Sequence, residues 1–145
     1  MSSRFKGKVV LVTGAGRGIG FEVAKLFASN GAMVVVNDVP HTILPNSNSQ
    51  IPGGNAILAA EKINSAGGNA RAIECDVSDF EQTKQMVARI IDELGGVHVL
   101  INNAGFLTMG LPWEITEKQW DEGINVCLKG TWNCTRHVLE PMKDN

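Results

Sequence analysis

Closely spaced glycines between a strand-like segment and a helix-like segment are the residues of this chain best suited to chemistry. Residues 13–20 read Thr-Gly-Ala-Gly-Arg-Gly-Ile-Gly and follow the apolar run of residues 9–12. Glycine adopts positive φ and, because it has no Cβ, lets a ligand approach the backbone. The first turn of a helix adds unpaired N–H groups and the positive end of the helix dipole. The segment therefore predicts a binding site for a pyrophosphate group.

The order of the glycines distinguishes between phosphate-binding motifs. The segment does not match G-x-G-x-x-G, and it lacks the Gly-Lys-Ser/Thr of a P-loop. It matches T-G-x-x-x-G-x-G through Thr13, Gly14, Gly18 and Gly20. An ordinary glycine-rich turn between a strand and a helix is the alternative, and the neighbouring motifs argue against it.

Asp38 follows the second apolar run, about twenty residues beyond the glycines, where an acidic residue binds the adenosine ribose and repels a 2′-phosphate. A loop or helix-capping aspartate is the alternative. Arg17, inside the glycine segment, is a second cofactor-binding candidate, because it could hold a 2′-phosphate; it could equally be a solvated loop residue. Since Asp38 stands at the discriminating position, we expect NAD as the cofactor, with NADP less favoured.

Two further segments follow strand-like runs. Asp76 and Val77 come after the third run, where the carboxylate could meet an adenine amino group or merely precede a helix cap. Residues 102–105, Asn-Asn-Ala-Gly, follow the fourth run, on the edge where open α/β sheets bind ligands. Small residues there let the backbone pass close to a flat ligand, and the amides can bind a carbonyl or bridge two elements.

The elements that carry these residues alternate between strand and helix. Continuous apolar runs predict buried strands at residues 9–13, 33–36, 70–75 and 97–101, with helical spacing after each. This alternation predicts right-handed crossovers and an α/β fold, a doubly wound parallel sheet with helices on both faces. Residues 39–54 are rich in Pro, Gly, Asn and Ser and are expected to form a long surface loop.

Capping sequences and apolar stripes indicate where the helices begin and which face they bury. Residues 78–81 predict a capping box with Ser78 as the N-cap, and residues 116–119 predict a second box. The helix after the first box is expected to bury Phe80, Thr83, Val87, Ile90, Ile91 and Leu94. The last helix is expected to carry an apolar stripe of Trp120, Ile124, Cys127, Leu128, Thr131 and Val138. We expect a homo-oligomer that forms through this last helix.

Composition excludes several classes of protein. The chain has 145 residues, 43% of them hydrophobic and 19% charged, as expected of a single globular domain. A net charge of -2 without a basic block gives no reason to expect nucleic acid or an anionic membrane as a partner. The apolar runs are too short to span a bilayer, and the N-terminus leaves no room for a signal peptide. Three cysteines without zinc-type spacing predict a cytoplasmic protein with no metal site.

Together, these motifs resemble the short-chain dehydrogenase/reductase family over the whole chain. The resemblance is carried by residues 13–20, Asp38, residues 76–77, residues 102–105 and residues 125–130. It implies a Rossmann-type fold, one partial domain over residues 1–145 that ends after the fourth strand and its helix. It also implies hydride transfer between NAD and a secondary alcohol or ketone, a small-molecule substrate.

The resemblance assigns a role to each matched residue. It implies that the pyrophosphate contacts Gly14, Gly18, Ile19 and Gly20. It implies that Asp38 contacts the adenosine ribose and that Asp76 and Val77 contact the adenine. The nicotinamide-side ribose would contact Asn103, Ala104 and Gly105. Asn125 matches the helix asparagine that organises a water in the family's proton relay, and is the one catalytic candidate. The loop that begins at residue 37 looks like that of the hydroxyacyl-CoA dehydrogenases of β-oxidation, which hints at a 3-hydroxyacyl-CoA-like substrate.

The departures from the family limit what the chain can do. The family's catalytic serine and its Tyr-x-x-x-Lys pair have no counterpart, and the chain contains no tyrosine. Carbonyl reduction needs an acid beside the oxygen and a cation that lowers its pKa. We therefore expect a cofactor-binding fragment that is inactive alone, weak in NAD affinity and marginally stable. A non-catalytic, NAD-binding regulatory module is the alternative. A methyltransferase-like domain is a third hypothesis, disfavoured by residues 102–105. His98 is expected to be structural, and His41 and His137 suggest no site.

Overall fold

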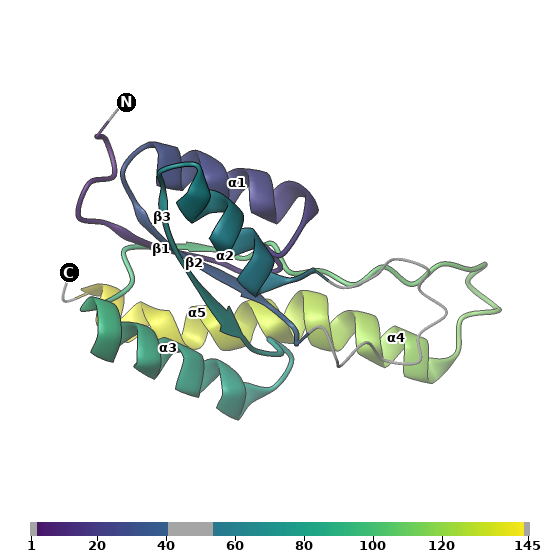
Figure 1. Cartoon of the computed structure of the whole chain (residues 1–145). Coiled ribbons are helices and arrows are strands. Elements are labelled where there is room, and N and C mark those ends of the chain that lie inside the picture. The colour runs from purple at the N-terminus through teal and green to yellow at the C-terminus, as the bar shows by residue number, and fades with distance from the viewer. Residues whose placement is uncertain (1–2, 41–53, 144–145) are drawn as a thin grey trace.

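The computed structural model describes residues 3–40 and 54–143 of the chain (Figure 1). The elements, in chain order, are β1 (Val9–Val12), α1 (Gly18–Ser29), β2 (Met33–Asp38), α2 (Ala56–Ser65), β3 (Asn69–Glu74), α3 (Phe80–Leu94), β4 (Val99–Ile101), α4 (Glu117–Ile124), the π-helix η1 (Asn125–Lys129) and α5 (Gly130–Lys143). Most of the loop expected at residues 39–54, together with His41, lies outside the described residues. Within the described part, no helix has the length and apolar character needed to cross a membrane.

The four strands form one parallel sheet in the order β3-β2-β1-β4. β1 lies between β2 and β4, with Leu11 level with Val35 on one side and Leu100 on the other. Since strands that follow one another in the chain run in the same direction, each connection crosses over through a helix. The predicted α/β fold with a doubly wound, Rossmann-like parallel sheet is confirmed.

Helices cover both faces of the sheet, so β1 and β2 read as continuous apolar runs rather than alternating ones. Val10 and Val12 point into the core beneath α1 and α2, whereas Val9 and Leu11 point into the core shared with α3 and α5. Figure 1 shows the two helix pairs on opposite sides of the sheet. The same strand therefore contributes to two cores, which fixes the carboxyl ends of β1 and β2 between rigid layers.

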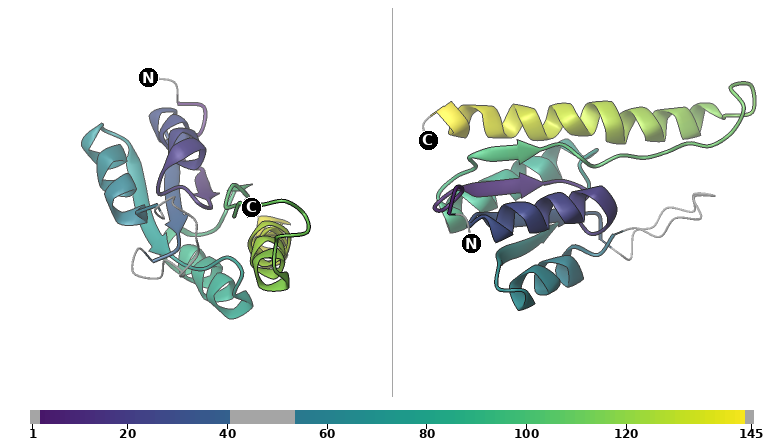
Figure 2. Two further views of the ribbon diagram at one scale, coloured as in Figure 1. Left: turned by 90° about the vertical axis from the view of Figure 1, so that its right-hand side faces the viewer. Right: turned by 90° about the horizontal axis from the view of Figure 1, so that it is seen from above.

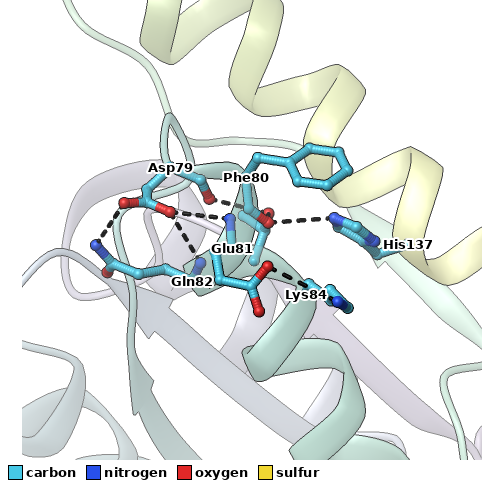
Figure 3. A network of polar contacts seen from close by, with 7 residues as sticks. Asp79, Phe80, Glu81, Gln82, Lys84 and His137 are labelled. Atoms are coloured by element: carbon cyan, nitrogen blue, oxygen red, sulfur yellow. Dashed lines mark hydrogen bonds and ion pairs between the residues drawn. The ribbon is translucent and has the colours of Figure 1, made fainter.

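The predicted capping box at residues 78–81 is wrong: the N-cap lies one residue later, and its N–H donates to the Asp76 carbonyl rather than to a side chain that reaches back. Asp79, not Ser78, is the N-cap of α3: its Oδ1 accepts the N–H groups of Glu81 and Gln82, both at 2.9 Å (Figure 3). The Ser78 hydroxyl is already used, because it donates to Asp76 Oδ1 at 2.7 Å. The second box is confirmed, with Thr116 as the N-cap of α4.

The start of α3 is joined to α5 by a ring cluster. Phe80 lies 4.5 Å from His137 and 5.7 Å from Trp132, measured between ring centroids. His137 Nε2 also lies 3.2 Å from the carbonyl oxygen of Phe80 (Figure 3). These contacts keep Phe80 at the surface, between two helices rather than in the core.

The buried faces of α3 and the last helix differ from those expected. α3 buries Met86 together with the predicted Thr83, Val87 and Ile90, whereas Phe80 and Ile91 are exposed. The single last helix is instead three segments, α4, η1 and α5, whose buried side chains include Asn133, Cys134 and Val138. Of the predicted stripe, Val138 is buried, while these members are exposed: Trp120, Ile124, Cys127, Leu128 and Thr131. For the four members in α4 and η1, the reason is that these segments extend past the sheet (Figure 2).

Candidate functional site

The glycines between β1 and α1 have different surroundings. A Cβ on Gly14 would lie 2.7 Å from Ala104 Cα, and one on Gly20 would collide with Asn103 Nδ2. These two glycines are therefore needed for close packing against the segment after β4. Gly18 has a positive φ of 56°, and a Cβ there would meet nothing within 4 Å. Gly18 alone of the three leaves open space, which is where a ligand could approach the backbone.

The N-terminus of α1 is open beside Gly18. Arg17 is the N-cap residue, in an extended conformation, and its side chain makes no capping hydrogen bond. No acidic residue lies in the first turn, and both Gly18 and Ile19 are exposed. The first N–H groups of a helix have no partner inside the helix, so the exposed Gly18 and Ile19 present backbone donors at the positive end of the dipole. A pyrophosphate is an anion that fits this arrangement.

Asp38, the last residue of β2, faces the glycine segment. Its Oδ2 accepts the Gly16 N–H at 2.9 Å, and its Oδ1 accepts the Val39 N–H at 2.9 Å. Burial raises the pKa of Asp38 above its ordinary value, against the two N–H bonds and the charge of Arg17, which lower it. A carboxylate has about four lone-pair sites, so two acceptor positions remain for other donors such as ribose hydroxyls.

Asn103 joins the end of β4 to the glycine segment. Its Nδ2 donates to the carbonyl oxygens of Thr13 at 2.9 Å and Gly14 at 3.0 Å. In return, Thr13 Oγ1 accepts the N–H groups of Asn103 at 3.1 Å and Ala104 at 3.0 Å. Of the two roles considered for these amides, Asn103 therefore performs the bridging one. The part played by the Thr13 hydroxyl was not foreseen, because a threonine at the end of an apolar run reads as part of the strand.

The residues after β3 are held by local structure. Asp76 Oδ1 accepts the Ser78 N–H at 2.9 Å and the Ser78 hydroxyl, which forms a turn before α3. Val77 is buried against Gly130, and a Cβ added at Gly130 would lie 2.7 Å from Val77 Cγ2. Asn133 Nδ2 donates to the Val77 carbonyl at 2.8 Å. The turn reading of Asp76 is thus observed, and contact with adenine stays a prediction.

Asn125 opens the π-helix, where the Gly130 N–H donates to its carbonyl oxygen. Single π turns inside helices are rare and occur frequently at functional sites. The preceding loop packs on this turn, since the Phe106 N–H donates to Cys127 Sγ at 3.3 Å. Residues 102–106 therefore connect the glycine segment to the π turn. Sequence reasoning predicted Asn125 but not the π turn, because residues 125–129 carry no proline or bulge signal.

His98 has the predicted structural role. Its ring Nδ1 accepts the Val9 N–H at 3.0 Å, and its backbone N–H donates to the Val9 carbonyl at 2.9 Å. His98 therefore starts the pairing of β1 with β4. Partial burial, followed by the charge of Lys8, lowers its pKa. His137 lies in the ring cluster on α5, outside the site. In the described part of the chain, no group of three or more His, Cys, Asp or Glu side chains could hold a metal.

Comparisons with known proteins agree with this geometry. Residues 8–145 match the family described as short chain dehydrogenase. An uncharacterized oxidoreductase of Thermotoga maritima is 36% identical over 139 residues, which cover 96% of this chain and 50% of that protein. The peroxisomal multifunctional enzyme A of Dictyostelium discoideum is 40% identical over 146 residues, 99% of this chain and 31% of that enzyme.

Solved structures give the same result. A short chain dehydrogenase from Mycobacterium avium superposes with a TM-score of 0.81 at 34% identity, covering 96% of this chain and 49% of that one. The citronellol catabolism dehydrogenase of Pseudomonas aeruginosa gives a TM-score of 0.82 at 29% identity, covering 97% and 52%. The chain thus spans about half the length of most of these relatives.

Proposed function

The chain belongs to the short-chain dehydrogenase family, and we propose from this premise that residues 1–145 are the NAD-binding portion of an oxidoreductase. The observation that carries the proposal is the open N-terminus of α1 at Gly18, with the carboxylate of Asp38 beside it. The first supplies N–H donors for a pyrophosphate, and the second supplies acceptors for the adenosine ribose. Bound NAD would supply the hydride acceptor for a secondary alcohol, or in reduced form the donor for a ketone.

NAD is preferred to NADP in this proposal because of the position of Asp38. Its carboxylate is held against the Gly16 N–H, so its negative charge stands next to the glycine segment and would repel a 2′-phosphate. Burial raises the pKa of Asp38, and the N–H bonds from Gly16 and Val39 and the charge of the exposed Arg17 act against that rise, in favour of the ionised carboxylate. We propose that this ionised form is the one that binds ribose.

The catalytic step belongs to a longer protein in this proposal. The chain has no tyrosine to act as the acid beside a carbonyl oxygen, and Asn125 is its one residue that matches the family's proton relay. We therefore propose that residues 1–145 bind NAD without turnover. The substrate class we propose for a full-length protein is 3-hydroxyacyl-CoA-like, from the resemblance of the loop that begins at Asn37. A cytoplasmic location remains part of the proposal.

Association through the last helix is also proposed. Its apolar side chains Trp120, Leu128 and Trp132 are 62%, 66% and 54% exposed. Large exposed apolar side chains along one helical segment favour contact with another protein surface. We propose that a second copy of the chain covers this segment.

Isothermal titration of the chain with NAD tests the proposal. Asp38→Ala should weaken NAD binding by about 10- to 150-fold, since hydrogen bonds to a charged group contribute about 1.5–3 kcal/mol. Asp92→Ala is the matched control, because Asp92 is an exposed aspartate on α3, and it should leave the affinity unchanged. Equal loss in both variants would sink the assignment of Asp38, and no NAD binding by the unmodified chain would sink the proposed function.

A further inference from the structure

Three backbone segments meet at one oxygen of Asp38. A Cβ on Gly54 would collide with Asp38 Oδ2 and would lie 2.8 Å from Gly16 Cα. A Cβ on Gly16 would lie 2.7 Å from the same oxygen and 2.5 Å from Asn55 N. The Asp38 carboxylate, at the end of β2, is therefore in direct contact with the backbone of the glycine segment and of the chain that enters α2.

The absence of a side chain, rather than an unusual backbone, is what this contact requires. Gly16 and Gly54 are not among the glycines of the described chain that have positive φ, unlike Gly14 and Gly18. Another residue could adopt their backbone conformations, but its Cβ would displace either the carboxylate or the facing backbone. Glycine is therefore required at position 54 because of the close contact with Asp38 and Gly16.

Gly54 is held in place by the helix that follows it. Asn55 is the N-cap of α2, and its side chain accepts the Leu58 N–H at 2.9 Å. Ala56 is fully buried, and Ile63 is 1% exposed in the core beneath the sheet. Because α2 is packed through this face, Gly54 presses on Asp38 from a fixed position.

We propose that Gly54 is a positioning residue for Asp38: its side-chain-free backbone holds the carboxylate against the Gly16 N–H, in the orientation that accepts the adenosine ribose. The inference deepens the proposed function and rests on it for the ribose. The burial of Asp38 that raises its pKa is consistent with this close backbone cover. The positioning contact itself exists without any cofactor, so it can be tested separately.

The first test follows the Gly16 amide by NMR while the carboxylate of Asp38 is titrated. In the unmodified chain, the Gly16 N–H shift should follow the ionisation of Asp38, because the N–H donates to Oδ2. Gly54→Ala should remove this coupling, whereas Gly123→Ala should keep it. Gly123 is a matched control because its Cβ would meet only Thr108 Oγ1, at an ordinary 3.6 Å.

The second test is a double-mutant cycle on NAD affinity, which isolates an effect that passes through another residue. Gly54→Ala should weaken NAD binding by about fivefold in the unmodified chain, and by less than about twofold in the Asp38→Ala background. Asn55→Ala, which removes the cap of α2 without adding a Cβ at the contact, should act in the same direction to a smaller extent.

The positioning role and the proposed function can fail separately. The positioning role would be overturned if the Gly16 amide shift did not change with the ionisation of Asp38 in the unmodified chain, or if it changed equally in Gly54→Ala. Equal losses of NAD affinity from Gly54→Ala with and without Asp38 would overturn it too. If the coupling is lost in Gly54→Ala but the unmodified chain binds no NAD, positioning stands and the proposed function fails. If Gly54→Ala does not fold, the Gly16 amide shift of the unmodified chain and the NAD affinity of Asn55→Ala still test the positioning role.

Discussion

The two sides of β1 differ in how completely the chain covers them. On the β2 side, Val34, Val35 and Val36 are fully buried, and the Asp38 carboxylate is in contact with the backbone of Gly16 and Gly54. On the β4 side, the three strand residues are only half-buried, and β4 stands at the edge of the sheet. Apolar side chains beyond it are exposed, with Met109 and Trp113 at 79%.

The geometry of the proposed site depends on this difference in packing. The pyrophosphate and ribose groups of the proposed site lie on the covered side, so their positions depend on packing that this chain completes alone. Asn125 begins η1, between α4 and α5, and the loop after β4 contacts this turn through Phe106 and Cys127. The helical segment that contains them extends past the sheet on the less covered side (Figure 2). We therefore expect substitutions on the two sides to differ in kind, with effects on folding and NAD binding on one and on association on the other.

The largest difference is expected between two leucines. Leu11 is fully buried in β1, whereas Leu128 is 66% exposed in η1. Leu11→Ala should lower the free energy of unfolding by about 2–5 kcal/mol, because it removes buried atoms and leaves a cavity. Leu128→Ala should change it by less than about 0.5 kcal/mol. Urea denaturation of both variants measures this, and similar losses would mean that η1 is as well packed as the central strand β1.

A smaller effect is expected at the junction between the two sides. Gly20→Ala places a Cβ against Asn103 Nδ2, so the bridge from β4 to the glycine segment must shift. We expect a loss of about 1–3 kcal/mol, the usual range for overpacking, together with weaker NAD binding. Gly123→Ala serves as the control in both measurements. A Gly20→Ala chain with unchanged stability would show that this junction is loose.

Acid should loosen the β4 side in particular. The pKa of His98 is lowered in the folded chain, chiefly by burial, so the unfolded chain binds the proton more tightly. Its contribution to stability should therefore be constant above its ordinary value of about 6.5 and decline as pH falls below it. The unfolding free energy of the unmodified chain, compared with His98→Gln between about pH 7.5 and 5, measures this contribution. If the unfolding free energies of the unmodified chain and His98→Gln changed with pH in parallel, His98 would not be the source of the pH dependence.

The smallest effect on folding is expected on the exposed stripe, where the effect on association should be clear. Trp120→Gln combined with Leu128→Gln alters side chains that are 62% and 66% exposed, so stability should change by less than about 0.5 kcal/mol. Sedimentation velocity should show a homo-oligomer in the unmodified chain and a monomer in the double variant. A monomer in both cases would contradict association through this face.

Sequence reasoning found the elements of the covered side well, for a physical reason. β1 and β2 are buried on both faces, and the resulting apolar runs predict strands whatever the rest of the fold does. The glycine segment was located equally well. The separate roles of Gly14, Gly18 and Gly20 could not be predicted, because they depend on residues 103–104, which approach from the far end of the chain.

The errors lie where local rules allow two answers. Ser78 and Asp79 are both good N-caps, and the choice was decided by Asp76, which binds the Ser78 hydroxyl. The apolar stripe of the last helix has the spacing of a buried face, but periodicity does not say whether a partner element is present. The contact of Gly54 with Asp38 has no sequence signal, since a glycine before a helix is ordinary.

The most direct test of the central claim is the ratio of NAD to NADP affinity, measured by titrating the chain with each cofactor under identical conditions. We expect saturable binding of NAD, weaker binding of NADP, and a smaller difference between the two affinities in Asp38→Ala because the repulsive charge is gone. Tighter binding of NADP, or no binding of either cofactor, would show that Asp38 does not select NAD in this chain.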